Sequence, residues 1–387
     1  MLTPRIKFVN FQIKKKKKIK IQKNFFTIHN LVNKYKFLSS LTTNYSYGYS
    51  KKLINKFKKN SVFRLIGMGG STLGAEAIYQ FLNNDTKKDF MFINNLKPNL
   101  SKYEKNPKAV NLIISKSGNT LETIANSNLL LKKNKNIFIT EKKNTCLFNL
   151  AHKLKSEVVE HKNFIGGRYS VLSEVGMLPA ELMGFKEKKF KQLNYLIKNK
   201  YFLRNLINNV SSILAFVEMG KFNSVILNYD EQSDNLLKWY QQLVAESLGK
   251  KSKGIFPIIS KMPKDNHSLL QLYLDGPKKN FFTFFNVFEK KSERFKKTIR
   301  YESLNYLNNK SFFQILNAQQ KATQNVFKKK KIPFRSFEIL KRDEKTLGEL
   351  FSFFILETIL LGKALKVNPF DQPSVDLIKK ETKKILF

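Results

Sequence analysis

Cysteine, glycine and proline are scarce in this sequence of 387 residues, which has 1 Cys, 16 Gly and 10 Pro. Because Cys146 stands alone, the chain has no internal disulfide and no CxxC pair for a zinc ribbon, so we expect a reducing compartment, the cytoplasm. The low Gly and Pro content, with 42% hydrophobic residues, excludes collagen-like, low-complexity and mostly disordered proteins. The sequence therefore predicts a packed globular protein.

Motifs of metal enzymes and serine hydrolases are also missing. No HExxH is present, and the His and Cys residues do not cluster at ligand spacings, which disfavours metal catalysis. No GxSxG sequence is present, so nothing supports a serine hydrolase. We expect neither a metal nor another cofactor.

The sequence lacks an apolar run long enough to span a membrane. Its most apolar stretch, 350–362, contains Glu357 and is shorter than the roughly 20 residues of a spanning helix, so it is interpreted as a core helix. The lysine run Lys14 to Lys18 is not followed by an apolar run of signal-peptide length. We therefore expect no membrane partner and no secretion.

Acidic residues are few beside the basic ones, since 29 Asp and Glu against 71 Lys and Arg give a net charge of +42. Such a charge by itself suggests nucleic acid or an anionic membrane surface as a partner. However, only 8 of the 71 are Arg, the usual reader of base edges, and the lysines are spread along the whole chain. Because an AT-rich coding sequence would produce this Lys, Asn, Ile and Phe excess, we do not expect a nucleic-acid partner.

The hydropathy pattern separates a polar N-terminal part from an α/β part. Residues 1–60 are Lys-rich and weakly patterned, which indicates an N-terminal extension. From Ser61, short apolar runs alternate with amphipathic stretches, the pattern of α/β proteins with mainly parallel sheets. We predict strands and helices in two sets: strands at 62–66, 90–93, 110–114 and 137–140 with helices at 75–82 and 122–133, then strands at 224–227, 254–259, 281–287 and 334–338 with a helix at 234–248.

These two sets predict two similar α/β domains followed by a C-terminal helix and tail. The expected boundaries are 1–60 for the extension, 61–200 for the first domain, 201–345 for the second, and 346–387 for the tail.

A glycine-rich turn, GMGGSTLG at 67–74, joins the first strand to the following helix. Exposed backbone N–H groups at such a turn favour an anion. A dinucleotide fingerprint is excluded because Thr72 occupies the third Gly position, and a P-loop is excluded because Ala75 and Glu76 replace its Lys and Ser/Thr. Taken alone, the segment is a tight strand-to-helix turn.

A second polar loop follows the third predicted strand and reads SKSGNTLET at 115–123. Hydroxyl donors and the positive end of a helix can hold a phosphomonoester without metal. A polar loop in which Thr120 merely caps its helix is the alternative. We favour a phosphate site, because this loop and the glycine turn are expected at the same sheet edge; its contacts would come from Ser115, Lys116, Ser117 and Thr120.

Together with these two loops, GGRYSVLSEVG at 166–176 makes the chain resemble the glucose-6-phosphate isomerase family, whose members have paired sugar-isomerase (SIS) domains. Three further segments match in order: QLVAESLGK at 242–250, DNHSLLQ at 265–271 and FDQPSVDLIK at 370–379. The resemblance covers residues 61–379, or 379 − 61 + 1 = 319 positions. It implies two SIS-type three-layer α-β-α sandwich domains with mainly parallel sheets, in the compact bacterial form.

Aldose–ketose isomerisation moves a proton between neighbouring carbons through an enediol, so a carboxylate base must face the sugar. The resemblance assigns this role to Glu246, which shares a predicted helix face with Gln242. A surface Glu at a helix end is the alternative. Arg168 after two glycines is expected to steady the enediolate, because a fixed guanidinium fork suits an oxyanion; the alternative is an ordinary surface salt bridge.

The resemblance also implies that four further residues contact the substrate: Gly70, Ser71, Gln242 and Gln372. Ring opening is assigned to His267, since histidine transfers protons near neutral pH, and to Lys379 in the tail. The other three histidines, His29, His152 and His161, have polar, Lys-rich neighbours in the sequence and are expected to be exposed. The resemblance also implies a homodimer in which His267 enters the site of the neighbouring subunit.

The tail departs from the family pattern. The family has Gly where this chain has Ser374 and Ile378, and Glu where it has Asp376, which makes the path to Lys379 uncertain.

The sequence therefore predicts reversible isomerisation of glucose 6-phosphate and fructose 6-phosphate, in glycolysis and gluconeogenesis. Two alternatives stay open. A related SIS isomerase acting on mannose 6-phosphate or another sugar phosphate, or with dual specificity, would share the phosphate loop and the base. A non-catalytic sugar-phosphate sensor would not need Glu246, Arg168 and His267 together.

Overall fold

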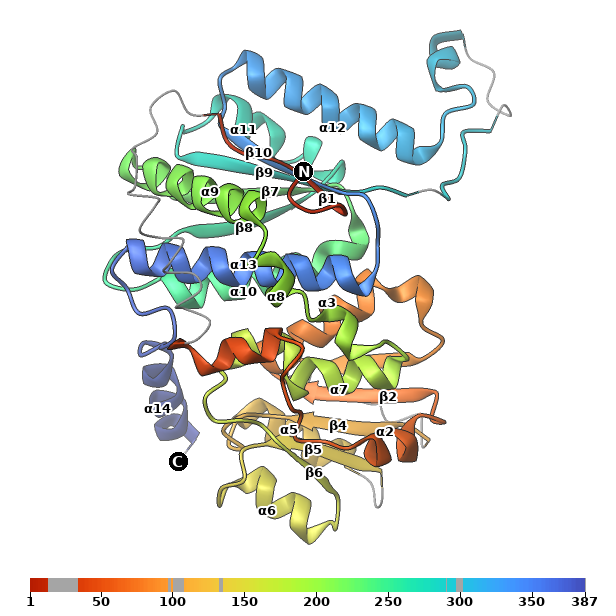
Figure 1. The fold of residues 1–387 in the computed structure, drawn as a ribbon, viewed down its shortest axis with the longest axis vertical. Helices are drawn as coiled ribbons and strands as arrows, with labels where there is room; N and C mark the ends of the chain where they lie inside the picture. Colours follow the sequence, from red (N-terminus) through yellow and green to blue (C-terminus); the bar gives the residue numbers. More distant parts are fainter. Residues whose placement is uncertain are drawn as a thin grey trace. The chain divides into compact units, whose positions relative to one another are not determined.

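The structure is a computed structural model that describes residues 1–12, 34–96, 99, 108–131, 135–289, 291–296 and 302–386 (Figure 1). The lysine run Lys14 to Lys18 and His29 lie outside the described residues. The chain forms two compact units, each assembled from three segments. Unit 1 comprises Met1–Ile19, Lys200–Glu231 and Ser252–Arg342, and unit 2 comprises Lys20–Asn199, Gln232–Lys251 and Asp343–Phe387.

Unit 2 contains a five-stranded sheet in which neighbouring strands are parallel. In sheet order its strands are β3 (Asp89–Ile93), β2 (Val62–Gly67), β4 (Val110–Ile114), β5 (Asn136–Thr140) and β6 (Glu157–Glu160). The strands β4 and β5 are buried along their whole length, which is expected of a parallel sheet covered on both faces.

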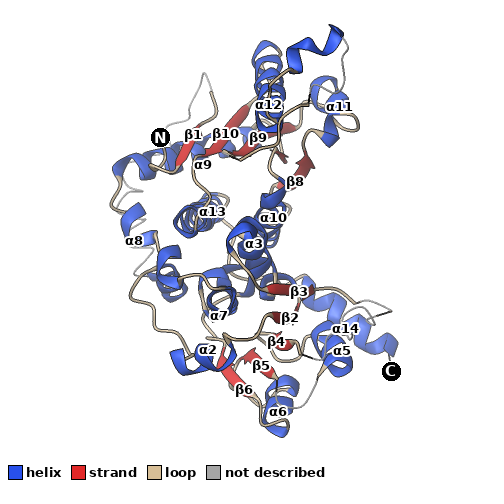
Figure 2. Ribbon diagram, turned by 90° about the vertical axis from the view of Figure 1, so that its right-hand side faces the viewer, coloured by secondary structure: helices blue, strands red, loops and turns tan. Residues whose placement is uncertain are grey.

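Helices cover both faces of this sheet (Figure 2). On one face, α5 (Leu121–Leu130) and α6 (Cys146–Lys153) bury Leu130 and Leu147 against Ile66, Ile113 and Phe138. On the other face, α3 (Leu73–Phe81) places Tyr79 against Phe90 and Phe92 at ring-centroid distances of 5.7 Å. Unit 2 therefore has the predicted three layers.

Unit 1 contains a second five-stranded sheet, in the order β1 (Ile6–Val9), β10 (Phe334–Ile339), β9 (Asn280–Val287), β7 (Asn223–Asn228) and β8 (Phe256–Lys261). All neighbours are parallel except the edge strand β1, which runs antiparallel to β10. Alternate residues of β9 face opposite helices, since Phe282 contacts Phe327 of α12 (Phe312–Lys329) and Phe281 stacks on Phe216 of α9 (Lys200–Glu218). This unit too is a three-layer sandwich.

The remaining helices of unit 2 include the one that carries Gln242 and Glu246. Helix α10 (Asp234–Leu248) packs on α3 and on α13 (Glu344–Ala364), which is buried along most of its length. The other helical elements are α2 (Lys51–Phe57), α7 (Glu174–Met183), α8 (Leu193–Leu196), α11 (Leu270–Asp275), α14 (Val375–Leu386) and the 3-10 turns η1 (Lys36–Leu41), η2 (Gly69–Ser71), η3 (Asn83–Asp85), η4 (Gly167–Leu172), η5 (Glu187–Phe190), η6 (Glu231–Ser233), η7 (Lys264–Asn266) and η8 (Glu302–Leu307).

The predicted α/β class with mainly parallel sheets is confirmed, and all eight predicted strands are present. The predicted core helix at 350–362 lies within α13, and the helix predicted at 234–248 is α10. Two strands, β1 and β6, were not predicted. Helix α10 clusters with unit 2, whereas the sequence placed it in the range 201–345.

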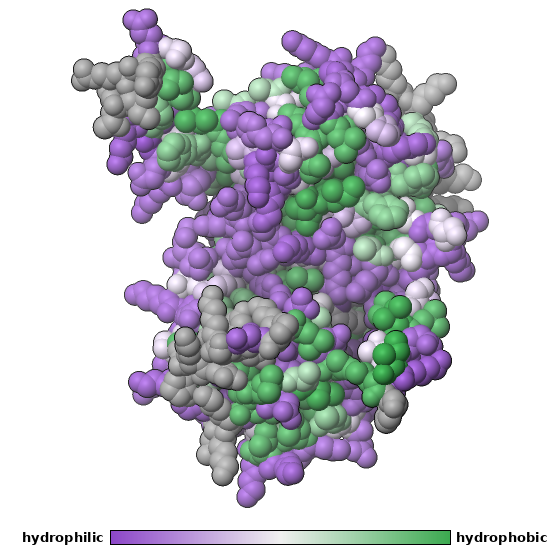
Figure 3. Space-filling view, turned by 180° about the vertical axis from the view of Figure 1, so that it is seen from behind, coloured by the Kyte–Doolittle hydropathy of each residue, from purple (hydrophilic) through white to green (hydrophobic). Residues whose placement is uncertain are grey.

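Hydrophilic side chains cover much of the face shown in Figure 3, interrupted by separate apolar areas. Among the described residues, no helix combines the length and the apolarity that crossing a membrane requires.

Candidate functional site

The site predicted from the sequence begins where β2 and β4 end. These strands are neighbours with Gly67 opposite Ile114, so the glycine turn after β2 and the 115–120 loop after β4 leave the sheet side by side. A Cβ on Gly67 would lie 2.8 Å from the carbonyl oxygen of Ile114, which shows how closely the two chain segments approach. The carboxyl edge of a parallel sheet is the usual place for ligands.

The glycine turn packs against two other segments through positions where a side chain could not fit. Gly69 has a φ of +53°, and a Cβ there would lie 2.7 Å from Nε2 of Gln242 on α10. A Cβ on Gly70 would lie 2.3 Å from the carbonyl carbon of Gly167 at the start of η4. The turn therefore brings together Gly70, Gln242 and the segment that carries Arg168.

The 115–120 loop presents the predicted hydroxyl groups in part. The hydroxyls of Ser115 and Thr120 are hydrogen-bonded at 2.9 Å, and Ser117 is exposed. Thr120 is the N-cap of α5, yet its side chain accepts no capping bond, so the first N–H groups of the helix are available to an anion.

Lys116 is turned toward a different neighbour. Its ammonium donates to the carbonyl of Asn163 at 2.7 Å and lies 3.9 Å from Glu141, and burial lowers its pKa. A contribution of Lys116 to phosphate binding therefore stays a prediction.

The loop is held by a residue that the sequence analysis did not single out. Asn119 Oδ1 accepts a hydrogen bond of 3.0 Å from the N–H of Cys146, the first residue of α6. Gly118 has a φ of +66°, and its carbonyl accepts from the N–H of Leu147. The order Gly-Asn within the motif was the available signal, since both residues favour such turns.

Glu246 lies near the end of α10 with 29% of its side chain exposed. Gln242, one helical turn earlier, donates from Nε2 to Glu246 Oε1 at 2.8 Å, as the i, i+4 spacing predicts. Gln242 Oε1 is a buried acceptor without a hydrogen-bond partner among the described residues. The carboxylate is thus oriented on one side and open to solvent on the other.

The guanidinium of Arg168 connects α10 to the 368–372 loop, and only 3% of the Arg168 side chain is exposed. A guanidinium group has five N–H donors, and each of them has an acceptor here. Nε donates to Ser247 Oγ (2.8 Å). Nη1 donates to Glu246 Oε2 (3.3 Å) and Gln372 Oε1 (2.8 Å). Nη2 donates to the carbonyls of Pro369 (2.7 Å) and Asp371 (3.0 Å). The bond to Glu246 is the longest and therefore the most easily exchanged for one to a substrate oxygen.

One hydrogen-bonded cluster thus contains four of the predicted residues, Arg168, Glu246, Gln242 and Gln372, and Gly70 adjoins it.

The loop 368–372, which Arg168 binds across some 200 positions of the sequence, is also held by Lys250. The ammonium of Lys250 donates to the carbonyls of Asn368 (2.6 Å) and Ser247 (3.0 Å) and pairs with Asp371 at 3.0 Å. Two cations therefore fix this loop to the end of α10.

We expect Lys250→Met to loosen this loop, because Met keeps the apolar stem and removes the ammonium. Gln372 would then lose its fixed position at Arg168, and kcat should fall by about threefold to tenfold while the protein stays folded. Steady-state kinetics and hydrogen exchange of the 368–374 backbone measure both effects. Lys251→Met, at an exposed neighbouring position, is the control; equal exchange in the two variants would contradict the role of Lys250.

Two of the predicted residues are carried by elements other than those of this cluster. His267 belongs to unit 1, where it follows η7 and is exposed. Lys379 lies on α14 and is exposed. Ile378, where the family has Gly, is 70% exposed, so its side chain meets no close packing; the side chain of Asp376 is outside the described residues.

The expectation that His161 is exposed is wrong, while His152 is exposed as predicted. His161 has only 2% of its surface exposed, because it follows β6 and its N–H bonds the carbonyl of Thr140 at the end of β5. Its Nδ1 lies 3.2 Å from the carbonyl of Lys162, which fits a neutral ring that donates from Nδ1. Burial lowers the pKa of His161 to about 4.

The buried His161 should make folding stability depend on pH. Below about pH 6.5 the unfolded chain binds a proton at this residue that the folded chain does not bind, so the free energy of unfolding falls as pH falls toward 4 and is constant above 7. The contribution of His161 to the slope of the unfolding free energy against pH approaches about 1.4 kcal/mol per pH unit. Urea unfolding at pH 7, 6 and 5 should show a smaller slope for His161→Gln than for the wild type and for His152→Gln. Identical slopes in all three proteins would contradict this account.

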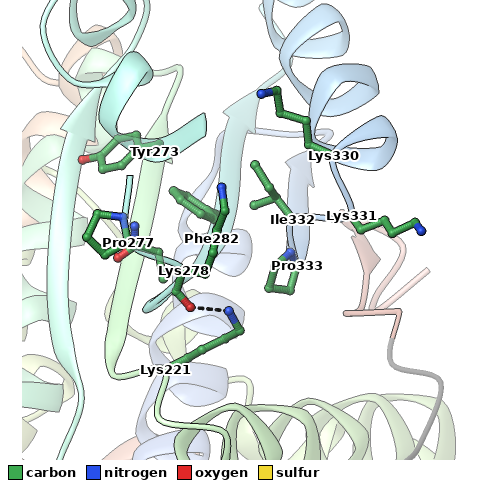
Figure 4. Close-up of a pocket in the computed structure, with 10 residues that line it drawn as sticks. Lys221, Tyr273, Pro277, Lys278, Phe282, Lys330, Lys331, Ile332 and Pro333 are labelled. Carbon is green, nitrogen blue, oxygen red and sulfur yellow. Dashed lines mark hydrogen bonds between the residues drawn. The ribbon is translucent and has the colours of Figure 1, made fainter. Parts of the chain in front are cut away.

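A further pocket of about 230 Å³ lies in unit 1 at the amino ends of β9 and β10 (Figure 4). Within the unit, Lys221 donates to the carbonyl of Lys278, Lys278 donates to the carbonyl of Leu274, and Lys330 pairs with Asp275. None of the predicted site residues lines it. Among the described residues, no group of three or more His, Cys, Asp or Glu could hold a metal ion.

Comparisons with known proteins find relatives over most of the chain. Residues 22–256 match the family model of phosphoglucose isomerase. The glucose-6-phosphate isomerase of Mycoplasmopsis pulmonis is 35% identical over 86% of this chain and 84% of its own length, and that of Methanocaldococcus jannaschii is 33% identical over 82% of each.

Solved structures share the fold. A hypothetical protein from Thermus thermophilus superposes with a TM-score of 0.82 over 95% of this chain and 94% of its own, at 23% identity. A glucose-6-phosphate isomerase from Chlamydia trachomatis gives a TM-score of 0.74 over 87% and 71%, at 20% identity. The fold, the order of the motifs and the sequence matches over most of the chain lead to one conclusion: the chain belongs to the phosphoglucose isomerase family.

Proposed function

We propose that this chain interconverts D-glucose 6-phosphate and D-fructose 6-phosphate by base-catalysed proton transfer through a cis-enediol. The observation that carries the proposal is the cluster at the end of α10, where the carboxylate of Glu246 is bound by Gln242 and Arg168 and remains partly exposed. A carboxylate held in this way can take a proton from one sugar carbon and return it to its neighbour.

The substrate phosphate would bind at the 115–120 loop. Ser115, Ser117 and Thr120 supply hydroxyls, the start of α5 supplies N–H groups, and Lys116 contributes positive charge. Gly70 and Ser71 belong to the glycine turn, which starts beside this loop at Gly67 and approaches Gln242 of α10 at Gly69, so they would line the sugar. Gln242 Oε1, a buried acceptor without a partner among the described residues, would take a sugar hydroxyl.

The base, Glu246, would remove the proton from C2 of glucose 6-phosphate and deliver it to C1. As the proton leaves, negative charge develops on the substrate oxygens. Arg168 would steady this charge by exchanging its 3.3 Å bond to Glu246 for one to an oxygen of the intermediate. Gln372, bound to the same nitrogen of Arg168, would line the site from the 368–372 loop.

Ring opening precedes this transfer and needs a proton to move between the ring oxygen and the anomeric hydroxyl. We assign it to His267 and Lys379, both exposed side chains. His267 would act from the neighbouring subunit of a homodimer. Mixing Glu246→Gln and His267→Ala subunits tests this: hybrid dimers should restore activity to about a quarter of the wild-type level, and no recovery would oppose it.

The wider setting follows from this reaction. We place the enzyme in glycolysis and gluconeogenesis in the cytoplasm, and we retain the division into SIS domains at 61–200 and 201–345 as a prediction.

A coupled assay that converts fructose 6-phosphate to glucose 6-phosphate tests the function, with mannose 6-phosphate offered in parallel. We expect interconversion of fructose 6-phosphate and glucose 6-phosphate to be at least about tenfold faster than turnover of mannose 6-phosphate, a difference that hydroxyl-specific contacts readily supply. Turnover of mannose 6-phosphate alone would replace the proposed substrate. Binding of hexose phosphate without any turnover would indicate a sensor instead.

A further inference from the structure

A buried chain of hydrogen bonds connects Arg168 to the start of the 368–372 loop. Arg168 Nε lies 2.8 Å from Ser247 Oγ, which lies 2.9 Å from the hydroxyl of Tyr169, and this hydroxyl lies 2.9 Å from the carbonyl oxygen of Pro369. Ser247 is completely buried and Tyr169 is 2% exposed. Both residues belong to motifs that the sequence analysis singled out, but neither has a role in the proposed chemistry.

The direction of every proton in this chain follows from the chemistry of its two ends. A carbonyl oxygen only accepts, so Tyr169 donates its proton to Pro369, and burial raises the pKa of Tyr169, which keeps this proton in place. Ser247 must then donate to Tyr169. An arginine only donates, so Ser247 receives the N–H of Arg168. Each hydroxyl is both donor and acceptor, with no alternative arrangement.

Ser247 differs from three other buried hydroxyl residues of the helices. Ser211, Ser212 and Thr358 are buried, and each donates to the carbonyl four residues earlier in its own helix. The hydroxyl of Ser247 is instead hydrogen-bonded to two side chains of η4, Arg168 and Tyr169. This hydroxyl therefore links elements and does not stabilise α10 locally.

The link has a geometric consequence for the neighbouring base. A guanidinium group is planar, so fixing Nε on Ser247 fixes the directions of its remaining N–H groups. One of these points at Glu246, the residue directly before Ser247 on α10, and another points at Gln372. Hydrogen-bonded chains of this kind strengthen one another in a buried setting.

We propose that Ser247 is a positioning residue of the isomerase: with Tyr169 it sets the plane of the Arg168 guanidinium relative to Glu246 and couples α10 to the loop at Pro369. This inference rests on the proposed roles of Glu246 and Arg168. Ser247 and Tyr169 touch no substrate in this scheme, and they act only through Arg168.

The test compares Ser247→Ala, Ser247→Cys, Tyr169→Phe and the double variant Ser247→Ala/Tyr169→Phe. We expect Ser247→Ala to lower kcat by about tenfold to a hundredfold with KM for fructose 6-phosphate changed by less than about threefold, because the phosphate loop is not part of the chain. Cys, a weak donor and acceptor of similar size, should give an intermediate kcat. The double variant should lose no more than about threefold beyond the larger single loss, because both changes break one chain.

Ser211→Ala and Tyr229→Phe are the matched controls, since each removes a buried, hydrogen-bonded hydroxyl of unit 1. The hydroxyl of Ser211 bonds the carbonyl of Ile207 at 2.9 Å, and that of Tyr229 bonds Thr323 at 3.3 Å. Their melting temperatures should fall as those of the test variants do, with kcat unchanged. Wild-type kcat in folded Ser247→Ala, or strictly multiplicative losses in the double variant, would overturn the inference. Glu246→Gln separates the two proposals: if it retains full activity, the proposed base is wrong, whereas its loss beside a fully active Ser247→Ala removes only the role of Ser247.

Discussion

Glu246→Gln is expected to lower kcat by a factor on the order of 10² to 10⁴, which corresponds to about 3 to 5 kcal/mol of transition-state stabilisation. The amide is isosteric with the carboxylate and its oxygen can still accept from Gln242 or Arg168, but it cannot take a proton from carbon. KM for fructose 6-phosphate should change by less than about threefold, because the phosphate contacts lie on another loop. Steady-state kinetics of the coupled assay measures both constants.

A second readout isolates the proton transfer itself. With glucose 6-phosphate deuterated at C2 as the substrate, the wild type should release the label into water, and Glu246→Gln should retain it over the same time. Glu181→Gln is the matched control, because Glu181 is a carboxylate of the same unit with 7% of its side chain exposed, and Tyr49 and Lys51 bind it. It should lose stability and keep kcat. Equal rates in wild type and Glu246→Gln, in either readout, would remove Glu246 from its assigned role.

Most of the eight predicted strands could be found because they are short, nearly continuous apolar runs. The two strands that were missed lack this signal for physical reasons. β1 alternates buried and exposed residues over only four positions, and its Lys7 pairs with Glu338 across the sheet. β6 begins and ends with Glu and has a single fully buried residue, Val159. Edge strands read as polar segments because solvent reaches one side of them.

The position of α10 shows a different limit. Its pattern of apolar residues predicted the helix and its bounds, but not the unit to which it belongs. That choice depends on Trp239, which meets Phe351 of α13 at 4.7 Å, and on Tyr240, which donates to the buried Glu357 of α13. Such pairings lie more than 100 positions apart, and no local pattern encodes them.

The site was predictable through its motifs and not through its contacts. The spacing of Gln242 and Glu246 on one helix face indicated their hydrogen bond. By contrast, nothing near Arg168 in the sequence points to the carbonyls of Pro369 and Asp371, because backbone acceptors leave no trace in side-chain identity. His161 was misjudged for the same reason, since its N–H bonds the backbone carbonyl of Thr140, an acceptor that the residues around His161 in the sequence do not reveal.

Arg168→Lys is expected to lower kcat by about 10² to 10³ and the free energy of unfolding by about 3 kcal/mol, although the charge is kept. A lysine ammonium has three donors on one nitrogen and cannot reach the five acceptors that the guanidinium fork binds from three directions. The carbonyls of Pro369 and Asp371 would lose their donors, and Glu246 would lose its fixed neighbour. Kinetics and urea unfolding report the two losses separately.

The matched control is Arg335→Lys on β10 of unit 1. Arg335 is completely buried, and it donates to Thr283 at 2.9 Å and to Asn209 at 2.7 Å, so its replacement should cost a similar amount of stability. It has no part in the site, and kcat of the folded variant should equal that of the wild type. If Arg168→Lys and Arg335→Lys lose stability alike and both keep wild-type kcat, Arg168 is a structural residue and the assignment of the intermediate's charge to it fails; a loss of kcat confined to Arg168→Lys is the result that the cluster at the end of α10 requires.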